Sequence, residues 1–233
     1  MLTTICFDAD DTLWHNERFF KLTQAYFAEL LADYSDPETL EARLLEAERR
    51  NIQRYGFGIK GFTLSMIETA CQVTDNRVPG SVIAELIAAG QEMLQHPIEL
   101  LPHAKEVVQG LAPDFTLLVV TKGDLLDQER KLAQSGLGDV FDGAEIVTDK
   151  TPEVYRGIFS RRGIDPGSAM MVGNSLKSDV IPPIEAGAWG VYVPHGDTWA
   201  LEAAEAPRRN TRFREIASLD EIPDLITGIC RNI

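Results

Sequence analysis

The stretch Thr4-Ile5-Cys6-Phe7-Asp8-Ala9-Asp10-Asp11-Thr12-Leu13 decides how this chain of 233 residues folds. A short apolar run rich in β-forming residues that ends abruptly in carboxylates predicts a buried strand, which delivers acids to one edge of a sheet. In an extended segment Asp8 and Asp10, two residues apart, point to the same side. One carboxylate of such a pair can attack an electrophile while the other handles a proton.

Carboxylates crowded in this way also indicate a cation. They repel one another unless a metal ion or a proton lies among them, and Mg²⁺ is the hard cation that prefers oxygen ligands. The alternative interpretation of the same stretch is an acidic turn, in which Asp10 or Asp11 is a solvated helix N-cap. Sequence context beyond residue 13 is needed to choose between the two.

Three later segments place polar side chains after an apolar run or at the start of a helical pattern. They are Leu117-Leu118-Val119-Val120-Thr121, Lys150-Thr151-Pro152-Glu153-Val154-Tyr155, and Ala169-Met170-Met171-Val172-Gly173-Asn174-Ser175, which leads to Asp179. With the first stretch, they resemble the four ordered signatures of the haloacid dehalogenase-like hydrolase superfamily. The resemblance covers nearly the whole chain.

The resemblance implies a role for each signature residue. Asp8 would attack phosphorus and become an aspartyl-phosphate, while Lys150 would neutralise the charge on Asp8 and on the transferring group. Asp10 would protonate the leaving oxygen and then deprotonate the hydrolytic water. Thr121 would hydrogen-bond a phosphoryl oxygen. The presence of Asp10 separates phosphotransferases from the dehalogenases of the superfamily, which lack the second acid.

The resemblance also implies an Mg²⁺ site formed by Asp8, the backbone carbonyl of Asp10, Asp179 and Asn174. The commonest form of the fourth signature has an acid where this chain has Asn174. An amide can ligate weakly or hold a metal-bound water, but it removes one negative charge. We therefore expect weaker metal binding rather than different chemistry.

Two segments are candidates for substrate contacts. Lys122 and Gly123 resemble the substrate-side loop of the superfamily, where a backbone amide approaches phosphate. The second segment, Arg54 to Phe62, combines glycines, aromatic faces and cations, and we expect Tyr55, Phe57 and Lys60 to bind substrate. The alternative is a helix–helix connector whose aromatic residues pack on the core.

The periodicity of the sequence predicts the fold. Residues 15–95 are helical throughout, with an N-cap and first-turn proline at Asp36-Pro37 and further helices over 62–73 and 80–94. From about residue 100, strands and helices alternate, which predicts a parallel sheet with helices on both faces. We expect an α/β, doubly wound parallel sheet formed by residues 1–14 and 96–233, with an inserted all-helical cap domain over residues 15–95.

Composition limits the partners and the setting. The net charge of −14 argues against nonspecific binding to nucleic acid or to an anionic membrane, since both favour a positive surface. No stretch approaches the roughly 18–20 apolar residues of a membrane span. The three scattered cysteines suggest neither a disulfide framework nor a zinc ribbon, so a reducing cytoplasm is the simplest setting. The sequence leaves open whether the protein is a monomer or a homodimer.

The four histidines show no metal-ligand spacing along the sequence; they are His15, His96, His103 and His195. For His15, which follows the first signature, we favour surface or flap packing over substrate contact. No histidine is therefore assigned to the chemistry.

These observations predict a magnesium-dependent phosphomonoesterase that hydrolyses a small phosphorylated metabolite through an aspartyl-phosphate. Two alternatives within the enzymes are a 2-haloacid dehalogenase and a phosphonatase-like hydrolase, the latter with Lys60 as a Schiff-base lysine. An alternative from another class is a catalytically degenerate protein that binds phosphate or metal, for which Asn174 is the sequence support.

Overall fold

The computed structural model describes residues 1–196 and 199–231, and its contacts divide the chain into two compact units. An α/β unit comprises Met1–Glu17, Ile98–Lys122 and Gln128–Ile233. A helical unit comprises Arg18–Pro97 and Gly123–Asp127. The second segment of the helical unit was not expected from the sequence, which assigned only residues 15–95 to an inserted domain.

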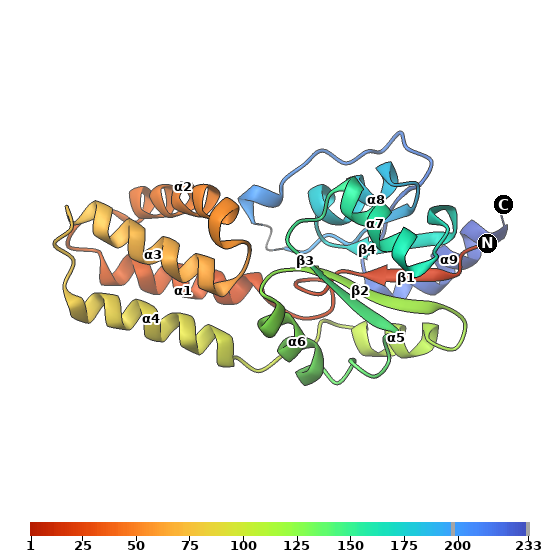
Figure 1. Ribbon diagram of the computed structural model, residues 1–233, viewed down its shortest axis with the longest axis horizontal. Coiled ribbons are helices and arrows are strands. Elements are labelled where there is room, and N and C mark those ends of the chain that lie inside the picture. The colour runs from red at the N-terminus through yellow and green to blue at the C-terminus, as the bar shows by residue number, and fades with distance from the viewer. Residues whose placement is uncertain (197–198, 232–233) are drawn as a thin grey trace. The chain divides into compact units, whose positions relative to one another are not determined.

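The α/β unit contains a six-stranded sheet with the order β3-β2-β1-β4-β5-β6 (Figure 1). All five strand pairings are parallel. The strands are β1 (Thr4–Phe7), β2 (Thr116–Lys122), β3 (Gly143–Val147), β4 (Ala169–Gly173), β5 (Trp189–Tyr192) and β6 (Phe213–Glu215). The order reverses at β1, between β2 and β4. Ligands of open α/β sheets bind at such a switch point, outside the carboxyl ends of the strands.

Helices cover both faces of this sheet because its buried strands are apolar on both sides. The helices are α5 (Ala104–Leu111), α6 (Leu125–Gln134), α7 (Pro152–Arg162), α8 (Ile181–Glu185) and α9 (Ile222–Arg231). Short turns of helix are η1 (Pro166–Ser168), the π-helix η2 (Leu176–Val180), η3 (Ala200–Glu202) and η4 (Leu219–Glu221). The predicted doubly wound α/β fold is confirmed.

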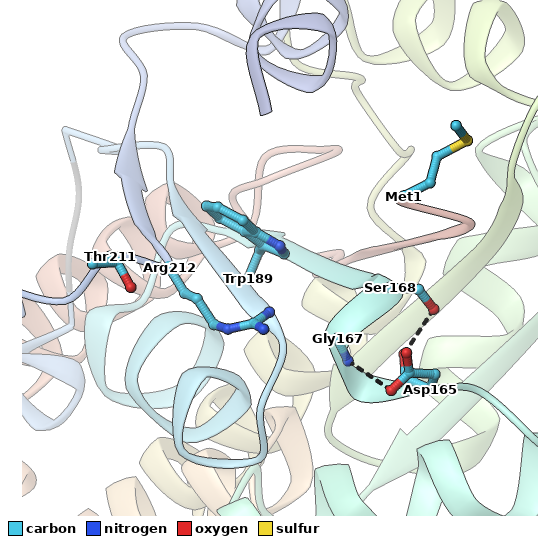
Figure 2. Close-up of a pocket in the computed structure, with 7 residues that line it drawn as sticks. All are labelled: Met1, Asp165, Gly167, Ser168, Trp189, Thr211 and Arg212. Atoms are coloured by element: carbon cyan, nitrogen blue, oxygen red, sulfur yellow. Dashed lines mark hydrogen bonds between the residues drawn. The ribbon is translucent and has the colours of Figure 1, made fainter. Parts of the chain in front are cut away.

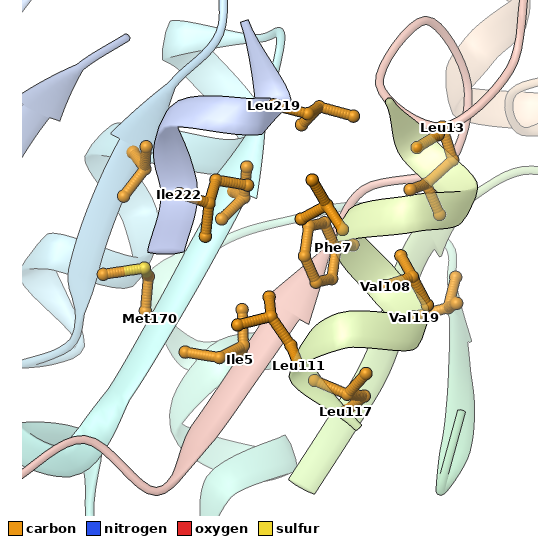
Figure 3. Close-up of a cluster of buried hydrophobic side chains, with 14 of the residues drawn as sticks. Ile5, Phe7, Leu13, Val108, Leu111, Leu117, Val119, Met170, Leu219 and Ile222 are labelled. Carbon is orange, nitrogen blue, oxygen red and sulfur yellow. The ribbon is translucent and has the colours of Figure 1, made fainter. Parts of the chain in front are cut away.

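Alternate residues of β1 supply two separate apolar cores. Ile5 and Phe7 pack in one cluster with α5 and α9 residues such as Val108 and Ile222 (Figure 3). Cys6 points to the other face, into a cluster that contains Tyr155 of α7. This alternation follows from the two-residue period of a strand, and it fixes β1 between two helical layers.

The helical unit has its own core. Its helices are α1 (Glu17–Leu30), α2 (Pro37–Tyr55), α3 (Ile59–Val73) and α4 (Gly80–Gln95). Phe27, Leu44, Met66 and Leu86, one from each helix, are fully buried in a single cluster. The carboxylate of Asp36 accepts a hydrogen bond from the Thr39 amide at the start of α2, as the N-cap pattern predicted.

The segment before α8 contains one turn of π-helix. Pro182 and Pro183 fit only the first turn of a helix, and α8 begins at Ile181, close to Asp179. Directly before it, η2 winds through Asp179 with π-type hydrogen bonding. Single π-turns are frequent at functional sites, because they turn a side chain that an α-helix would direct elsewhere.

Among the described residues, no helix is both long and apolar enough to cross a membrane. Cys6, Cys71 and Cys230 are free thiols.

Candidate active site

The acidic stretch after β1 lies at the carboxyl edge of the sheet. Phe7 is opposite Val119 in β2 and Val172 in β4, and the Asp8 amide donates to the Val172 carbonyl at 2.9 Å. Asp8 therefore lies between the ends of two strands. Thr121 ends the neighbouring apolar run and is buried there. The parallel topology thus gathers the first, second and fourth signatures at one edge.

The centre of the site is a buried lysine held between two carboxylates. Lys150 Nζ donates to Asp8 Oδ1 at 2.5 Å and to Asp179 Oδ1 at 2.6 Å. The side chains of Lys150 and Asp179 are each only 1% exposed. Residues that lie 142 positions apart in the chain therefore form one ion-pair cluster, with one cation and two anions.

Local structure fixes the lysine and the second carboxylate. Thr151 caps α7, because its side chain accepts from the Val154 amide, and Pro152 occupies the first turn. Lys150 is thus held directly before a helix. In η2, the other oxygen of Asp179, Oδ2, accepts from the Ser175 amide at 2.9 Å. Thr151 therefore has a structural role of its own, as the N-cap of α7.

The pKa values of Asp8 and Lys150 are both raised in this cluster. Burial, followed by the neighbouring charge of Asp179, raises the pKa of Asp8 to about 7, against the opposing effect of Lys150. Burial would lower the pKa of Lys150, but the two carboxylates outweigh burial and raise it. Lys150 is therefore a permanent cation. It can balance the charge of only one of the two buried carboxylates, so a metal ion or a proton is needed to balance the other.

The oxygens beside this cluster converge on the amide of Asn174. With its nitrogen toward them, this amide donates to Asp8 Oδ2, Thr12 Oγ1 and the Asp10 carbonyl oxygen, each at 3.3 Å. Three oxygens that share one amide donor form a cluster of negative partial charge, which attracts a cation. Carboxylate, carbonyl and amide oxygens are the donors that Mg²⁺ prefers, so the residues present fit this ion.

Three donors fix the side chain of Asp10. Trp14 Nε1 and Lys131 Nζ donate to Oδ1 at 2.8 and 3.0 Å, and Gln128 Nε2 donates to Oδ2 at 2.8 Å. Burial would raise the pKa of Asp10, but the Lys131 charge and these hydrogen bonds outweigh burial and lower it. Asp10 is therefore an ionised carboxylate at neutral pH.

Lys122 and Gly123 occupy different surroundings. Lys122 Nζ donates to Glu202 at 2.6 Å and to Ser178 at 2.8 Å, so its side chain contacts protein groups. Gly123 has a φ of 136°, which a glycine adopts without strain, and it begins the segment that groups with the helical unit. The Thr121 hydroxyl donates to the Lys122 carbonyl at 3.4 Å.

The other expected substrate residues, Tyr55, Phe57 and Lys60, lie around the α2–α3 turn of the helical unit. Tyr55 ends α2 and is half exposed, and Phe57 lies between two glycines with positive φ. Lys60 Nζ donates to Asp124 at 2.8 Å within the same unit. Their role in substrate binding stays a prediction.

The sequence analysis missed the groups that support the motif residues. Thr12 donates to Asp8 Oδ2 at 3.3 Å, and its hydroxyl oxygen accepts from the backbone N–H of Asn174 at 3.1 Å, which connects two signatures. Glu202 accepts from Ser175 and Ser178, both at 2.5 Å. A threonine in the first signature was a visible signal for Thr12, whereas Glu202 lies in a tail with no legible pattern.

A separate pocket of about 360 Å³ lies at the opposite edge of the sheet (Figure 2). It is lined by residues that precede or begin β4, β5 and β6, including Ser168, Trp189 and Arg212. The amino ends of the strands form it, so it is distinct from the cluster around Lys150.

Comparisons with known proteins agree with this geometry. The model of the haloacid dehalogenase-like hydrolases matches residues 2–187. Glyceraldehyde 3-phosphate phosphatase from Methanothermobacter thermautotrophicus is 25% identical over 97% of this chain and 98% of its own. Mouse N-acylneuraminate-9-phosphatase is 26% identical, over 58% of this chain and 55% of its own.

A solved structure extends the match to three dimensions. The haloacid dehalogenase-like family hydrolase from Xanthomonas campestris is 36% identical and superposes with a TM-score of 0.88, over 97% of this chain and 91% of its own. The match of the family model to most of the chain, together with this structure, shows that the chain belongs to the haloacid dehalogenase-like hydrolase family.

Proposed function

We propose that this hydrolase is a magnesium-dependent phosphomonoesterase that acts on a small phosphorylated metabolite through an aspartyl-phosphate on Asp8. The observation that carries the proposal is the buried Asp8–Lys150–Asp179 cluster with a second acid, Asp10, two residues after the nucleophile. The relatives named as phosphatases support the same class of reaction.

The first half-reaction begins at Asp8. A carboxylate oxygen of Asp8 attacks the phosphorus atom, the bond from phosphorus to the leaving oxygen breaks, and the electron pair stays on that oxygen, which takes up a proton. Lys150 stabilises the added negative charge, because its ammonium group is fixed before the reaction starts and needs no reorganisation. Thr121 is proposed to donate a hydrogen bond to a phosphoryl oxygen.

Mg²⁺ would be held by Asp8, the Asp10 carbonyl, Asn174 and Asp179. When bound, it supplies positive charge that offsets the carboxylates and the phosphoryl oxygens. The amide of Asn174 lies against the first two of these groups, so it must turn its oxygen toward the ion. This is a change of one side-chain torsion, and it requires no movement of the backbone.

Asp10 supplies the proton transfers. In the second half-reaction it accepts a proton from the water that attacks phosphorus, which breaks the bond to Asp8 and releases inorganic phosphate. The pairing with Lys131 favours this basic form. To act as the acid in the first half-reaction, the carboxyl group of Asp10 has to break its ion pair with Lys131. The pKa of Asp10 rises once it is away from the lysine charge, so the group can then carry a proton.

Substrate selection is proposed to involve Tyr55, Phe57 and Lys60 of the helical unit, together with Gly123 and Lys122. The aromatic rings offer apolar faces, and Lys60 offers a cation that is paired with Asp124 at a partly exposed position. An anionic substrate group would compete with Asp124 for this lysine. Lys60→Met should therefore raise KM for such a substrate and leave kcat nearly unchanged.

The proposed function is tested by phosphate release from p-nitrophenyl phosphate, measured with Mg²⁺ and with EDTA for the wild type and Asp8→Asn. We expect turnover that needs the metal and is lost in the variant. Glyceraldehyde 3-phosphate and N-acylneuraminate 9-phosphate begin the metabolite panel. Chloride release from 2-chloropropionate, with no phosphatase activity on any compound, would overturn the proposal in favour of a dehalogenase.

A further inference from the structure

Two histidines that are distant in sequence meet beside the first signature. His15 and His195 have ring centroids 6.0 Å apart, at an interplanar angle of 63°. Asp11 lies next to both, and its Oδ1 is 3.8 Å from His195 Nδ1. One ligand atom from each of the three side chains lies within 4.8 Å of the other two. The chain thus gathers two imidazoles and one carboxylate in a small volume.

The backbone fixes these side chains within the α/β unit. Asp11 accepts hydrogen bonds from the amides of Asn16 and Glu17, at 2.8 and 2.9 Å, and it adopts a φ of 59° that few non-glycine residues take. The His15 amide donates to the Glu99 carbonyl at 3.0 Å. On the other side, the Val193 amide donates to Gly173 at 3.0 Å, which anchors the segment that leads to His195.

The spacing suits one small cation. Zinc binds imidazole nitrogen and carboxylate oxygen at about 2.0–2.2 Å with tetrahedral geometry, which places neighbouring ligand atoms about 3.3 Å apart. The Asp11–His195 separation of 3.8 Å needs a contraction of about 0.5 Å to reach this value, and because all the ligand atoms lie within 4.8 Å of one another, no pair needs more than about 1.5 Å. Side-chain torsions of the histidines can supply such a shift.

The donor set distinguishes this cluster from the proposed magnesium site. Imidazole nitrogens suit zinc, cobalt, nickel and copper, whereas Mg²⁺ prefers an all-oxygen shell. None of the three residues belongs to the set of Asp8, Asp10, Asn174 and Asp179.

We propose that Asp11, His15 and His195 form a second metal site, which binds Zn²⁺ or a similar transition-metal cation with three protein ligands and one open position. The ion would join the segment after β5 to the loop that carries Asp10. It is independent of the phosphatase proposal, because its ligands and its metal preference are different.

The test uses metal-stripped full-length protein in excess Mg²⁺, titrated with Co²⁺. The wild type should bind Co²⁺ at this site and show the intense visible absorption of four-coordinate cobalt. His15→Ala and His195→Ala should lose this absorption. Their Zn²⁺ affinity, measured by competition with Co²⁺, should fall at least about tenfold, since a change in a residue that only orients a metal ligand already costs this much. His96→Ala, which alters a histidine of the helical unit, is the matched control and should retain both.

Asp179→Asn separates the two sites. It removes a proposed magnesium ligand, and it should leave the cobalt spectrum intact. Circular dichroism of each variant checks that the fold is kept. Equal Zn²⁺ affinity in the wild type, His15→Ala and His195→Ala, or a cobalt signal lost in Asp179→Asn and kept in both histidine variants, would overturn the proposal.

Discussion

Lys131 Nζ lies 3.0 Å from Asp10 Oδ1, so the proposed acid–base residue is an ion-pair partner within the protein. Only 8% of the Lys131 side chain is exposed, which limits screening by solvent. The pair lowers the pKa of Asp10 although burial acts in the opposite direction. Lys131 thereby acts as a positioning residue that keeps Asp10 in its basic form.

Lys131→Met should raise the pKa of Asp10. The acidic limb of the pH profile of kcat, measured with a substrate for which hydrolysis of the aspartyl-phosphate limits turnover, should move to higher pH, because Asp10 acts as the base in that half-reaction. Lys105→Met, at an exposed position of α5, is the control and should leave the profile in place. An unchanged acidic limb in Lys131→Met would show that the pair does not set the ionisation of Asp10.

Lys150→Met leaves two buried carboxylates without their cation. We expect the free energy of unfolding to fall by about 3–5 kcal/mol in the absence of metal, because removing one partner of a buried ion pair leaves the other charge buried and uncompensated. Phosphatase activity should fall by at least about 10²–10³, the effect of losing a preorganised electrostatic group. Urea unfolding with EDTA and with Mg²⁺ measures the first effect, and Mg²⁺ should recover part of the loss.

Asn174→Asp restores the acid that the superfamily commonly has at this position. The extra negative charge should lower the Mg²⁺ concentration for half-maximal activity by about tenfold, which corresponds to about 1.4 kcal/mol. In metal-free protein the same change replaces a donor to Asp8 by a like charge, so stability should fall. Thermal unfolding of the wild type and Asn174→Asp across a Mg²⁺ titration tests both effects. Equal metal dependence in the two proteins would contradict the assignment of Asn174 to the metal site.

Glu202 gives a pH dependence of stability. Burial would raise its pKa, but the Lys122 charge and the hydrogen bonds from Lys122, Ser175 and Ser178 outweigh burial and lower it. A lowered pKa contributes stability above the ordinary pKa of 4.5, and this stability is lost as the pH falls through the folded-state pKa. Glu202→Gln should therefore cost about 1–3 kcal/mol near neutral pH, with the difference shrinking in acid. A pH-independent difference between the two proteins would contradict this assignment.

The sequence predicts the fold well because its signals are local. The apolar runs that end in polar residues correspond to β1, β2 and β4, and the parallel topology then brings Asp8 and Asp179 to one edge without further information. The N-cap at Asp36 and the helical stretch from 15 to 95 depend only on neighbouring residues. These features could be predicted from one sequence.

The supports of the site could not be predicted in the same way, because they depend on contacts across the chain. Leu125 and Leu126 in α6 are 59% and 72% exposed, while Gln128 and Lys131 are buried against Asp10. This reverses the usual amphipathic pattern of a helix, so hydrophobic periodicity assigns Lys131 to the solvent. The meeting of His15 with His195 is equally invisible along the sequence.

The central claim is that Asp8 carries the phosphoryl group during turnover. Its most direct test is to quench the reaction in the steady state with acid, reduce the protein with borohydride and sequence the peptides by mass spectrometry. An aspartyl-phosphate is reduced to homoserine, so the account predicts homoserine at position 8 in the wild type and none in Asp8→Asn. Turnover of substrate without modification of Asp8, or with modification of another residue, would contradict it.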